Sequence, residues 1–213
     1  MQTAYTEKIV GIPTNTALLE GSLVVPEHAQ GLVVFAHGSG SSRFSPRNNF
    51  VAAILQQADI ATLLVDLLTR KEDENYETRF DIDLLTERLL LVTRWLQNQP
   101  LTRKFAFGYF GASTGAAAAL RAAADDATIR AVVSRGGRPD MAVEALARVQ
   151  SPTLLIVGGN DSLVLKLNRQ ALAALRGTKR LAIIPGATHL FEERGALEEV
   201  ARLATQWFKR YLS

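Results

Sequence analysis

The feature of this sequence that most constrains its fold is the alternation of short apolar runs with segments of helical periodicity, which continues almost from end to end. The later runs are nearly all apolar and end at turn residues, which is typical of parallel strands covered on both faces. We expect strands at residues 8–12, 21–25, 31–37, 61–67, 104–110, 130–134, 153–158 and 180–185.

Helical periodicity fills the gaps between these runs. Leu85, Leu89 and Leu96 share one apolar face of a helix that Pro100 ends, and a last helix follows residue 195. Strands alternating with helices predict an α/β fold, in which helices cover both faces of an eight-stranded, mostly parallel, doubly wound sheet. The first two strands lie close together, so the sheet should start antiparallel. The other expected helices cover 47–58, 114–125, 140–148 and 163–176.

The bulk properties exclude several classes of protein. A chain of 213 residues without repeats or linkers predicts a single domain over residues 1–213. A net charge of +3 gives no reason to expect a nucleic-acid partner. The absence of cysteine excludes disulfides, thiolate metal sites and a cysteine nucleophile. Without a signal-peptide pattern or a long apolar run, we expect a cytoplasmic protein that does not enter the membrane; the sequence does not address its oligomeric state.

A serine among small residues is the first candidate for chemistry. Residues 111–115 read Gly-Ala-Ser-Thr-Gly, the G-x-S-x-G pattern, between an expected strand and an expected helix. This is the position of a nucleophile elbow, where Gly111 and Gly115 would leave room for a tight turn around Ser113. A flexible turn or a phosphate cradle would also be rich in small residues.

A serine nucleophile needs a base and an orienting acid. Of the three histidines, His28 lies in a polar turn and His37 ends a strand, whereas His189 follows the last strand, late in the chain as the order Ser, acid, His requires. Chain order favours Asp161, after the penultimate strand, as the acid. Asp66, which precedes the serine, remains the alternative, and Asp161 could also cap the next helix.

The oxyanion hole is expected from the glycine-rich segment at 37–42, which follows the third strand. Gly38 and Gly40 would let the main chain turn its N–H groups inward while His37 braces the loop. We expect the backbone amides of Ser39 and Thr114 to be the two donors.

These motifs together, "HGSG", "GASTG", "GGND" and "GATH" in that order, resemble the α/β-hydrolase superfamily, and the compact size is similar to its dienelactone-hydrolase-like branch. The resemblance covers essentially the whole chain. It implies a small-molecule acyl substrate, with Ser113 as nucleophile, His189 as general base and then acid, and Asp161 as orienting carboxylate. Dienelactone hydrolases proper use a cysteine nucleophile, so the serine implies general ester or lactone hydrolysis instead.

Only residues 135–151 separate the sixth and seventh strands, where many superfamily members insert a cap, so no cap domain is expected. Arg135 and Arg138 follow the sixth strand and are candidates to dock a substrate carboxylate. Arg43 and Arg47 are weaker candidates. The polar stretch at 69–81 predicts a solvated loop, or a rim near the site.

Other functions remain open. No cofactor is implied, and no metal-ligand spacing such as H-E-x-x-H occurs. A nucleotide-binding module would use the glycines at 108, 111 and 115, which do not form G-x-G-x-x-G. The same fold could also serve as a non-catalytic binding scaffold, or transfer an acyl group to an acceptor other than water.

Overall fold

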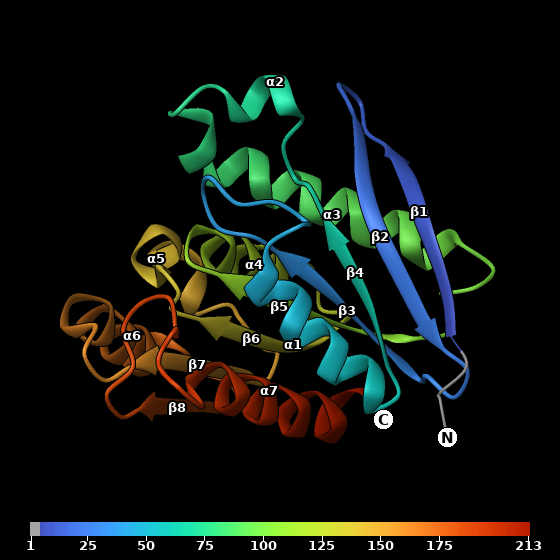
Figure 1. Cartoon of the computed structure of the whole chain (residues 1–213). Helices are drawn as coiled ribbons and strands as arrows, with labels where there is room; N and C mark the ends of the chain where they lie inside the picture. Colours follow the sequence, from blue (N-terminus) through green and yellow to red (C-terminus); the bar gives the residue numbers. More distant parts are fainter. Residues whose placement is uncertain (1–4) are drawn as a thin grey trace.

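The computed structural model describes residues 5–213, which form an eight-stranded sheet in the order β1-β2-β4-β3-β5-β6-β7-β8. Helices cover both faces of this sheet (Figure 1). The strands are β1 (Tyr5–Pro13), β2 (Leu18–Pro26), β3 (Gly31–Ala36), β4 (Ile60–Val65), β5 (Ala106–Ala112), β6 (Ile129–Arg135), β7 (Thr153–Gly158) and β8 (Lys179–Ile184).

The direction of the strands confirms the predicted mostly parallel sheet. β1 pairs with β2, and β2 with β4, in antiparallel register, whereas every later pair is parallel. β3, β4 and β7 are buried at every position, as apolar strands between two helical layers must be. The parallel strands therefore bring their carboxyl ends to a single edge of the sheet, where ligands bind in open α/β sheets.

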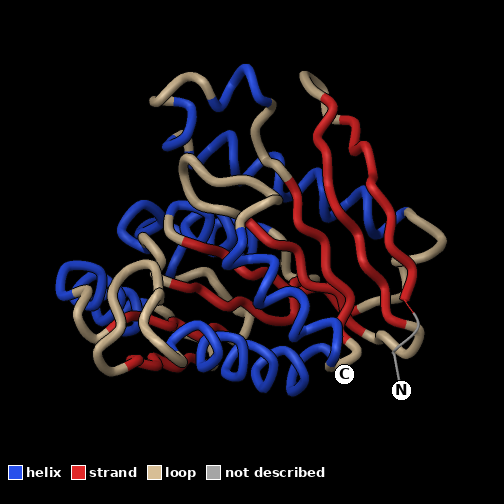
Figure 2. Tube along the Cα trace, in the orientation of Figure 1, coloured by secondary structure: helices blue, strands red, loops and turns tan. Residues whose placement is uncertain are grey.

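Two helical layers enclose the sheet (Figure 2). On one face, α1 (Pro46–Gln57) and α7 (Ala196–Leu212) pack together with side chains of β3 and β6. On the other face lie α3 (Ile82–Asn98), α4 (Thr114–Asp125) and α6 (Ser162–Ala174). The predicted apolar face of α3 is buried along its length. No helix within residues 5–213 has the length and apolar character needed to cross a bilayer.

Two predicted segments differ in detail from the structure. The helix expected at 140–148 is a 3₁₀ turn, η2 (Pro139–Ala142), followed by a short helix, α5 (Val143–Leu146), and no cap domain is present there. The polar stretch at 69–81 is not a plain loop, because it folds into α2 (Arg70–Asp73) and the 3₁₀ turn η1 (Thr78–Phe80). The capping box between Thr69 and Glu72 stabilises α2.

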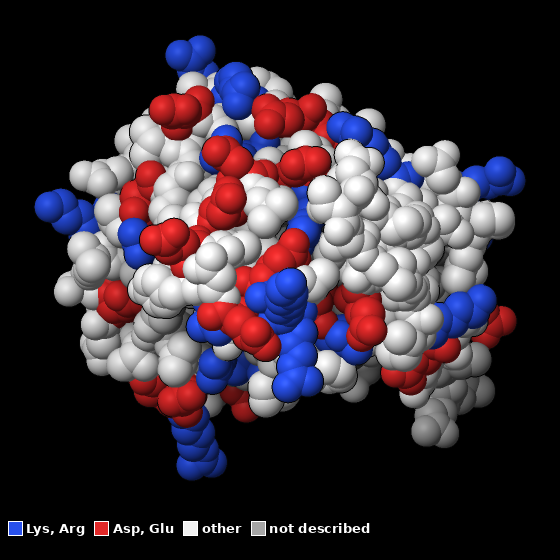
Figure 3. All heavy atoms as spheres, turned by 90° about the horizontal axis from the view of Figure 1, so that it is seen from above, with Lys and Arg blue, Asp and Glu red and all other residues white. Residues whose placement is uncertain are grey.

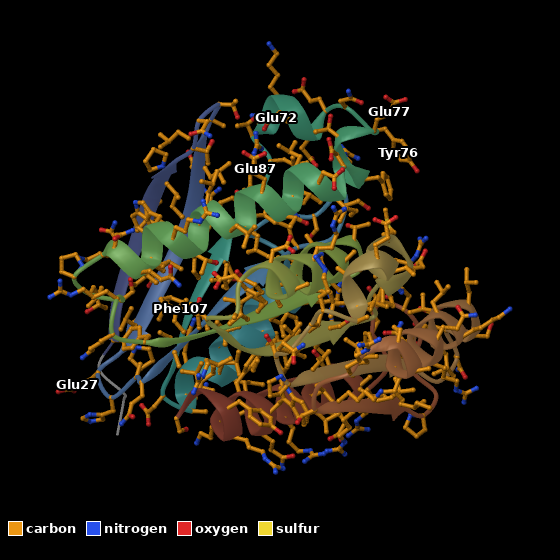
Figure 4. The ribbon with its side chains drawn as sticks, turned by 180° about the vertical axis from the view of Figure 1, so that it is seen from behind. Glu27, Glu72, Tyr76, Glu77, Glu87 and Phe107 are labelled. Carbon is orange, nitrogen blue, oxygen red and sulfur yellow. The ribbon has the colours of Figure 1, made fainter. Side chains whose placement is uncertain are left out.

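A partly buried ion pair fastens α2 to the body of the molecule. The Arg88 guanidinium, on α3 and only 2% exposed, donates to the two carboxylate oxygens of Glu72 at 2.7 and 2.5 Å, and also to the Leu67 carbonyl oxygen at 2.7 Å. Glu72 lies between α2 and α3, whereas Glu77 points outward (Figure 4). The hydrogen bonds from Arg88 are the main reason that the pKa of Glu72 falls from 4.5 to about 2.

We expect Glu72→Gln to lower the free energy of unfolding by about 2 kcal/mol at pH 7, because it leaves the Arg88 charge buried without a carboxylate. A depressed pKa stabilises the folded state above pH 4.5, and this stabilisation is lost as the pH falls towards 2. Urea titrations from pH 7 to pH 2 should therefore show the difference from the native chain shrinking over that range. Glu77→Gln, at an exposed position, is the control; an equal effect of both substitutions would contradict the assignment.

Candidate active site

Ser113 lies at the sharp turn between β5 and α4, with φ of 50° and ψ of −119°. It is one of three non-glycine residues with positive φ among residues 5–213, and such a conformation is strained for an L-residue. The turn is held by hydrogen bonds: Ser113 N–H donates to the Arg135 carbonyl at 3.2 Å, and the Ser113 carbonyl accepts from Arg138 N–H at 3.1 Å. The surrounding structure therefore maintains the strained conformation.

Glycines surround Ser113 because no side chain fits there. A Cβ added to Gly111 would lie 2.4 Å from Ala116 Cα, and a Cβ added to Gly115 would lie 2.2 Å from the Ala36 carbonyl oxygen. A Cβ on Gly38 would come within 3.0 Å of Ser113 Cβ. The low side-chain volume around the serine thus reflects the close approach of β3, β5 and α4 at this point.

His189 and Asp161 form a hydrogen-bonded pair at the same edge. His189 Nδ1 lies 2.7 Å from Asp161 Oδ2, and the two side chains are 40% and 15% exposed. Asp161 Oδ1 also accepts from Val164 N–H at 3.4 Å, so this carboxylate caps α6 as well. Asp161 follows β7 and His189 follows β8, the next strand in the sheet.

Gly136 links this pair to the serine. It follows Arg135, whose carbonyl binds Ser113 N–H, and a Cβ built on Gly136 would lie 3.4 Å from His189 Nδ1 and Cε1. The ends of β5, β6, β7 and β8 therefore carry Ser113, Gly136, Asp161 and His189 in sequence along one edge. Within residues 5–213 no hydrogen bond joins Ser113 Oγ to His189, and such bonds are often long without substrate.

The loop after β3 is held from two sides. Gly38 O lies 3.0 Å from His37 Nδ1 and accepts from Ser41 N–H at 3.2 Å, while Gly40 adopts a φ of +67°. The opposite side of the same peptide, Ser39 N–H, donates to Thr114 Oγ1 at 2.9 Å. Ser39 N–H thus faces the elbow, but it is already bonded to the hydroxyl of Thr114, a residue of which only the backbone amide was predicted to be a donor.

Asp66, the alternative acid, follows β4 and contacts Arg43 and not His189. Its carboxylate accepts from Arg43 N–H at 2.6 Å and pairs with the Arg43 guanidinium, and it is 3.9 Å from His37 Nε2. His28, in the polar turn after β2, is exposed. A pocket of about 540 Å³ opens beside this group, between the loop after β3 and the first turn of α2. Thr69, Arg70 and Asp73 line this pocket, so the polar stretch at 69–81 lies next to the loop after β3, whereas Ser113, Asp161 and His189 are not among the lining residues.

The arginines after β6 have different environments. Arg138 donates to both carboxylate oxygens of Asp140, at 2.8 and 2.7 Å, which raises the pKa of Arg138 and lowers that of Asp140. Arg135 is 8% exposed, its Nε has no partner within residues 5–213, and Nη2 reaches only Asn48 Oδ1 at 3.4 Å. Burial, and then the nearby Arg47 charge, lower the pKa of Arg135 to about 10.

Seen from above, basic and acidic side chains are interspersed (Figure 3). Within residues 5–213, no group of three or more His, Cys, Asp or Glu side chains is placed to hold a metal ion.

Comparison with known sequences identifies the family. The sequence model described as "Dienelactone hydrolase family" matches residues 19–212. The chain belongs to the dienelactone hydrolase family. A dienelactone hydrolase from Anabaena variabilis, solved as a crystal structure, is 55% identical, with a TM-score of 0.96 over 98% of this chain and 99% of that one. The match confirms the resemblance and the α/β-hydrolase fold, and it places the chain in a family of hydrolases.

A second sequence relative and a structural neighbour show how far the similarity extends. A Mycobacterium tuberculosis protein named as a phosphoribosyl transferase is 59% identical over 193 residues, which are 90% of this chain but 44% of that protein. The chain thus spans less than half the length of this relative. Est1E from Butyrivibrio proteoclasticus, with a TM-score of 0.82, 15% identity and coverage of 95% of this chain and 98% of that one, shares the fold with the dienelactone hydrolase family.

Proposed function

We propose that this chain is a serine hydrolase that cleaves carboxylic esters, lactones or related acyl compounds through an acyl-enzyme on Ser113. One observation carries the proposal: a serine strained at φ of 50° lies at the same sheet edge as a histidine that is hydrogen-bonded to a carboxylate. That is the combination of nucleophile, base and orienting acid that acyl transfer requires.

The position of the proton on His189 determines how Ser113 can be acylated. Since the Asp161 carboxylate can only accept, the 2.7 Å contact puts the proton on His189 Nδ1 and leaves a lone pair on Nε2. His189 Nε2 takes the Ser113 hydroxyl proton as Oγ attacks the carbonyl carbon, and the carbonyl electron pair moves to oxygen. When that pair returns, the alkoxide leaves with the proton from His189, and Ser113 stays esterified.

Deacylation repeats these steps with water. His189 accepts a proton from water as the hydroxide attacks the acyl carbon, and then returns it to Ser113 Oγ as the carboxylic acid leaves. The N-terminus of α4 faces the developing oxyanion, and Thr114 N–H, at its first position, has no acceptor within residues 5–213.

Labelling by a fluorophosphonate probe tests this proposal. The native chain should be labelled, and Ser113→Ala should not. Equal labelling of both would show that another residue is the nucleophile. Labelling of neither would favour a non-catalytic scaffold. Acyl transfer uses the same acyl-enzyme, so product analysis with and without an added alcohol separates it from hydrolysis.

Two other functions have less support. In a nucleotide-binding module of the dinucleotide type the glycine-rich turn follows the first strand, whereas here it follows β5. Phosphoribosyl transfer is the activity in the name of the Mycobacterium tuberculosis relative, of which this chain spans 44%, and no observation at the Ser113 edge favours it. Stabilisation by NAD(P) in a thermal shift measurement would favour the nucleotide-binding function.

We further propose that the substrate carries an anionic group that pairs with Arg135. Arg135 is a nearly buried cation with no carboxylate within 4.0 Å in the described chain. It ends β6, and a Cβ built on the next residue, Gly136, would lie 3.4 Å from His189. Leaving a charge buried and unpaired is costly, and a bound carboxylate or phosphate would compensate it. Arg138 is engaged by Asp140, so the proposal rests on Arg135.

Arg135→Met is therefore expected to lower kcat/KM for an ester that carries a carboxylate by about 10- to 100-fold, because one or two hydrogen bonds to a charged group are lost. An uncharged ester of equal length should change by less than about 3-fold. Arg130→Met, at an exposed position on the opposite end of β6, is the matched control and should affect neither ester. Equal losses for both esters in Arg135→Met would assign Arg135 a structural role only.

A further inference from the structure

The hydroxyl of Thr114 lies between the loop after β3 and the nucleophile turn. It accepts a hydrogen bond from Ser39 N–H at 2.9 Å, and Thr114 is only 2% exposed. On the other side of the 38–39 peptide, His37 and Ser41 both bind the Gly38 carbonyl oxygen. Ser39 N–H is therefore fixed towards Thr114 and is occupied before any substrate arrives.

The proton of this hydroxyl has no acceptor within residues 5–213. A threonine hydroxyl can donate one hydrogen bond and accept two, and Ser39 uses only an acceptor position. Helical threonines commonly donate to the carbonyl four residues earlier, as Thr86, Thr93 and Thr205 do in this chain. Thr114 is the first residue of α4, so the carbonyl four residues earlier belongs to β5 and not to the helix.

We propose that Thr114 supplies both donors of the oxyanion hole, its backbone N–H and its hydroxyl, and that Ser39 N–H acts through the hydroxyl as a positioning group. The inference rests on the proposed serine hydrolase function. It replaces the expectation that the Ser39 amide binds the oxyanion directly.

The geometry and the electrostatics agree with this role. The N–H and the Oγ of one residue are three bonds apart, so both can point at one acceptor beside the preceding residue, Ser113. A hydroxyl that accepts a hydrogen bond becomes a stronger donor, because each bond polarises the next. The rigid 38–39 peptide would hold the Thr114 side chain in one rotamer, so little reorganisation is needed when the charge develops.

Two substitutions separate this arrangement from the conventional one. Thr114→Val keeps the shape and the backbone N–H, removes the hydroxyl and releases Ser39 N–H. If the hydroxyl is the donor, kcat falls by about 100-fold or more with little change in KM, as for the loss of one oxyanion donor. Thr114→Ser keeps a hydroxyl and should retain kcat within about 5-fold.

A transition-state analogue provides a second measurement. A trifluoromethyl ketone forms an oxyanion with the serine, so Thr114→Val should weaken its inhibition about as much as it lowers kcat, while the KM of the ester stays constant. Thr114→Ala also removes the hydroxyl and replaces Thr114→Val if the valine variant has a lower melting temperature.

The inference is overturned if Thr114→Val keeps native kcat, since Ser39 N–H would then bind the oxyanion directly. It is also overturned if Thr114→Ser is as inactive as Thr114→Val, since the hydroxyl would then not matter. Failure of the proposed function gives a different result: Ser113→Ala would bind the trifluoromethyl ketone as tightly as the native chain does.

Discussion

Replacing Ser113 by alanine is expected to lower kcat for an aryl ester by about 10⁴-fold or more, to the level left by binding and the oxyanion donors alone. The loss follows from removing the only atom proposed to form the covalent bond. The same substitution should not destabilise the fold, because Ser113 Oγ makes no hydrogen bond within residues 5–213. Steady-state rates and urea denaturation of the purified variant measure the two effects separately.

Glycine at the same position gives an independent test of the strain. Ser113→Gly should be as inactive as Ser113→Ala and more stable than it by about 1 kcal/mol, because glycine adopts a φ of 50° without steric cost. Residual activity above about 1% of native in either variant would argue against Ser113 as the nucleophile. Equal stability of the two variants would argue that the elbow is not strained.

Asp161→Asn is the second substitution with a large expected effect, a fall in kcat of about 10³- to 10⁴-fold. An asparagine amide can donate to His189 Nδ1, which favours the tautomer with the proton on Nε2 and removes the base. An asparagine also caps helices as well as aspartate does, so α6 should keep its N-terminal cap and the melting temperature should change little. Activity assays and thermal unfolding of the same preparation test both statements.

Asp161→Ala completes the comparison. It should lose activity to a similar extent and also destabilise the protein by about 1 kcal/mol, since the cap on Val164 N–H is lost. If Asp161→Asn keeps native kcat, the orienting acid lies elsewhere. Asp66 is then the next residue to change, although in the structure it pairs with Arg43.

Much of the fold was predictable because periodicity depends on local chemistry. The strand at 153–158 and the helix at 114–125 coincide with β7 and α4. Segments without strong periodicity were less predictable: α2 depends on the capping box of Thr69 and on Arg88, a residue distant in the sequence. The division of residues 139–146 into η2 and α5 likewise depends on packing against α4 and α6.

The candidate site also has some features that the sequence predicts and others that depend on tertiary contacts. The sequence by itself determined the parallel sheet, the position of Ser113 at a strand-to-helix turn, and the need for small residues around it, because these follow from alternation and from volume. Only the tertiary structure decided which carboxylate meets His189, that Arg138 has a carboxylate partner whereas Arg135 has none within residues 5–213, and that Ser39 N–H is bonded to Thr114 Oγ1. The contacts of His189 and of Ser39 N–H join residues 28 and 75 positions apart, and their partners are selected by distance and direction in the folded chain, which no local pattern encodes.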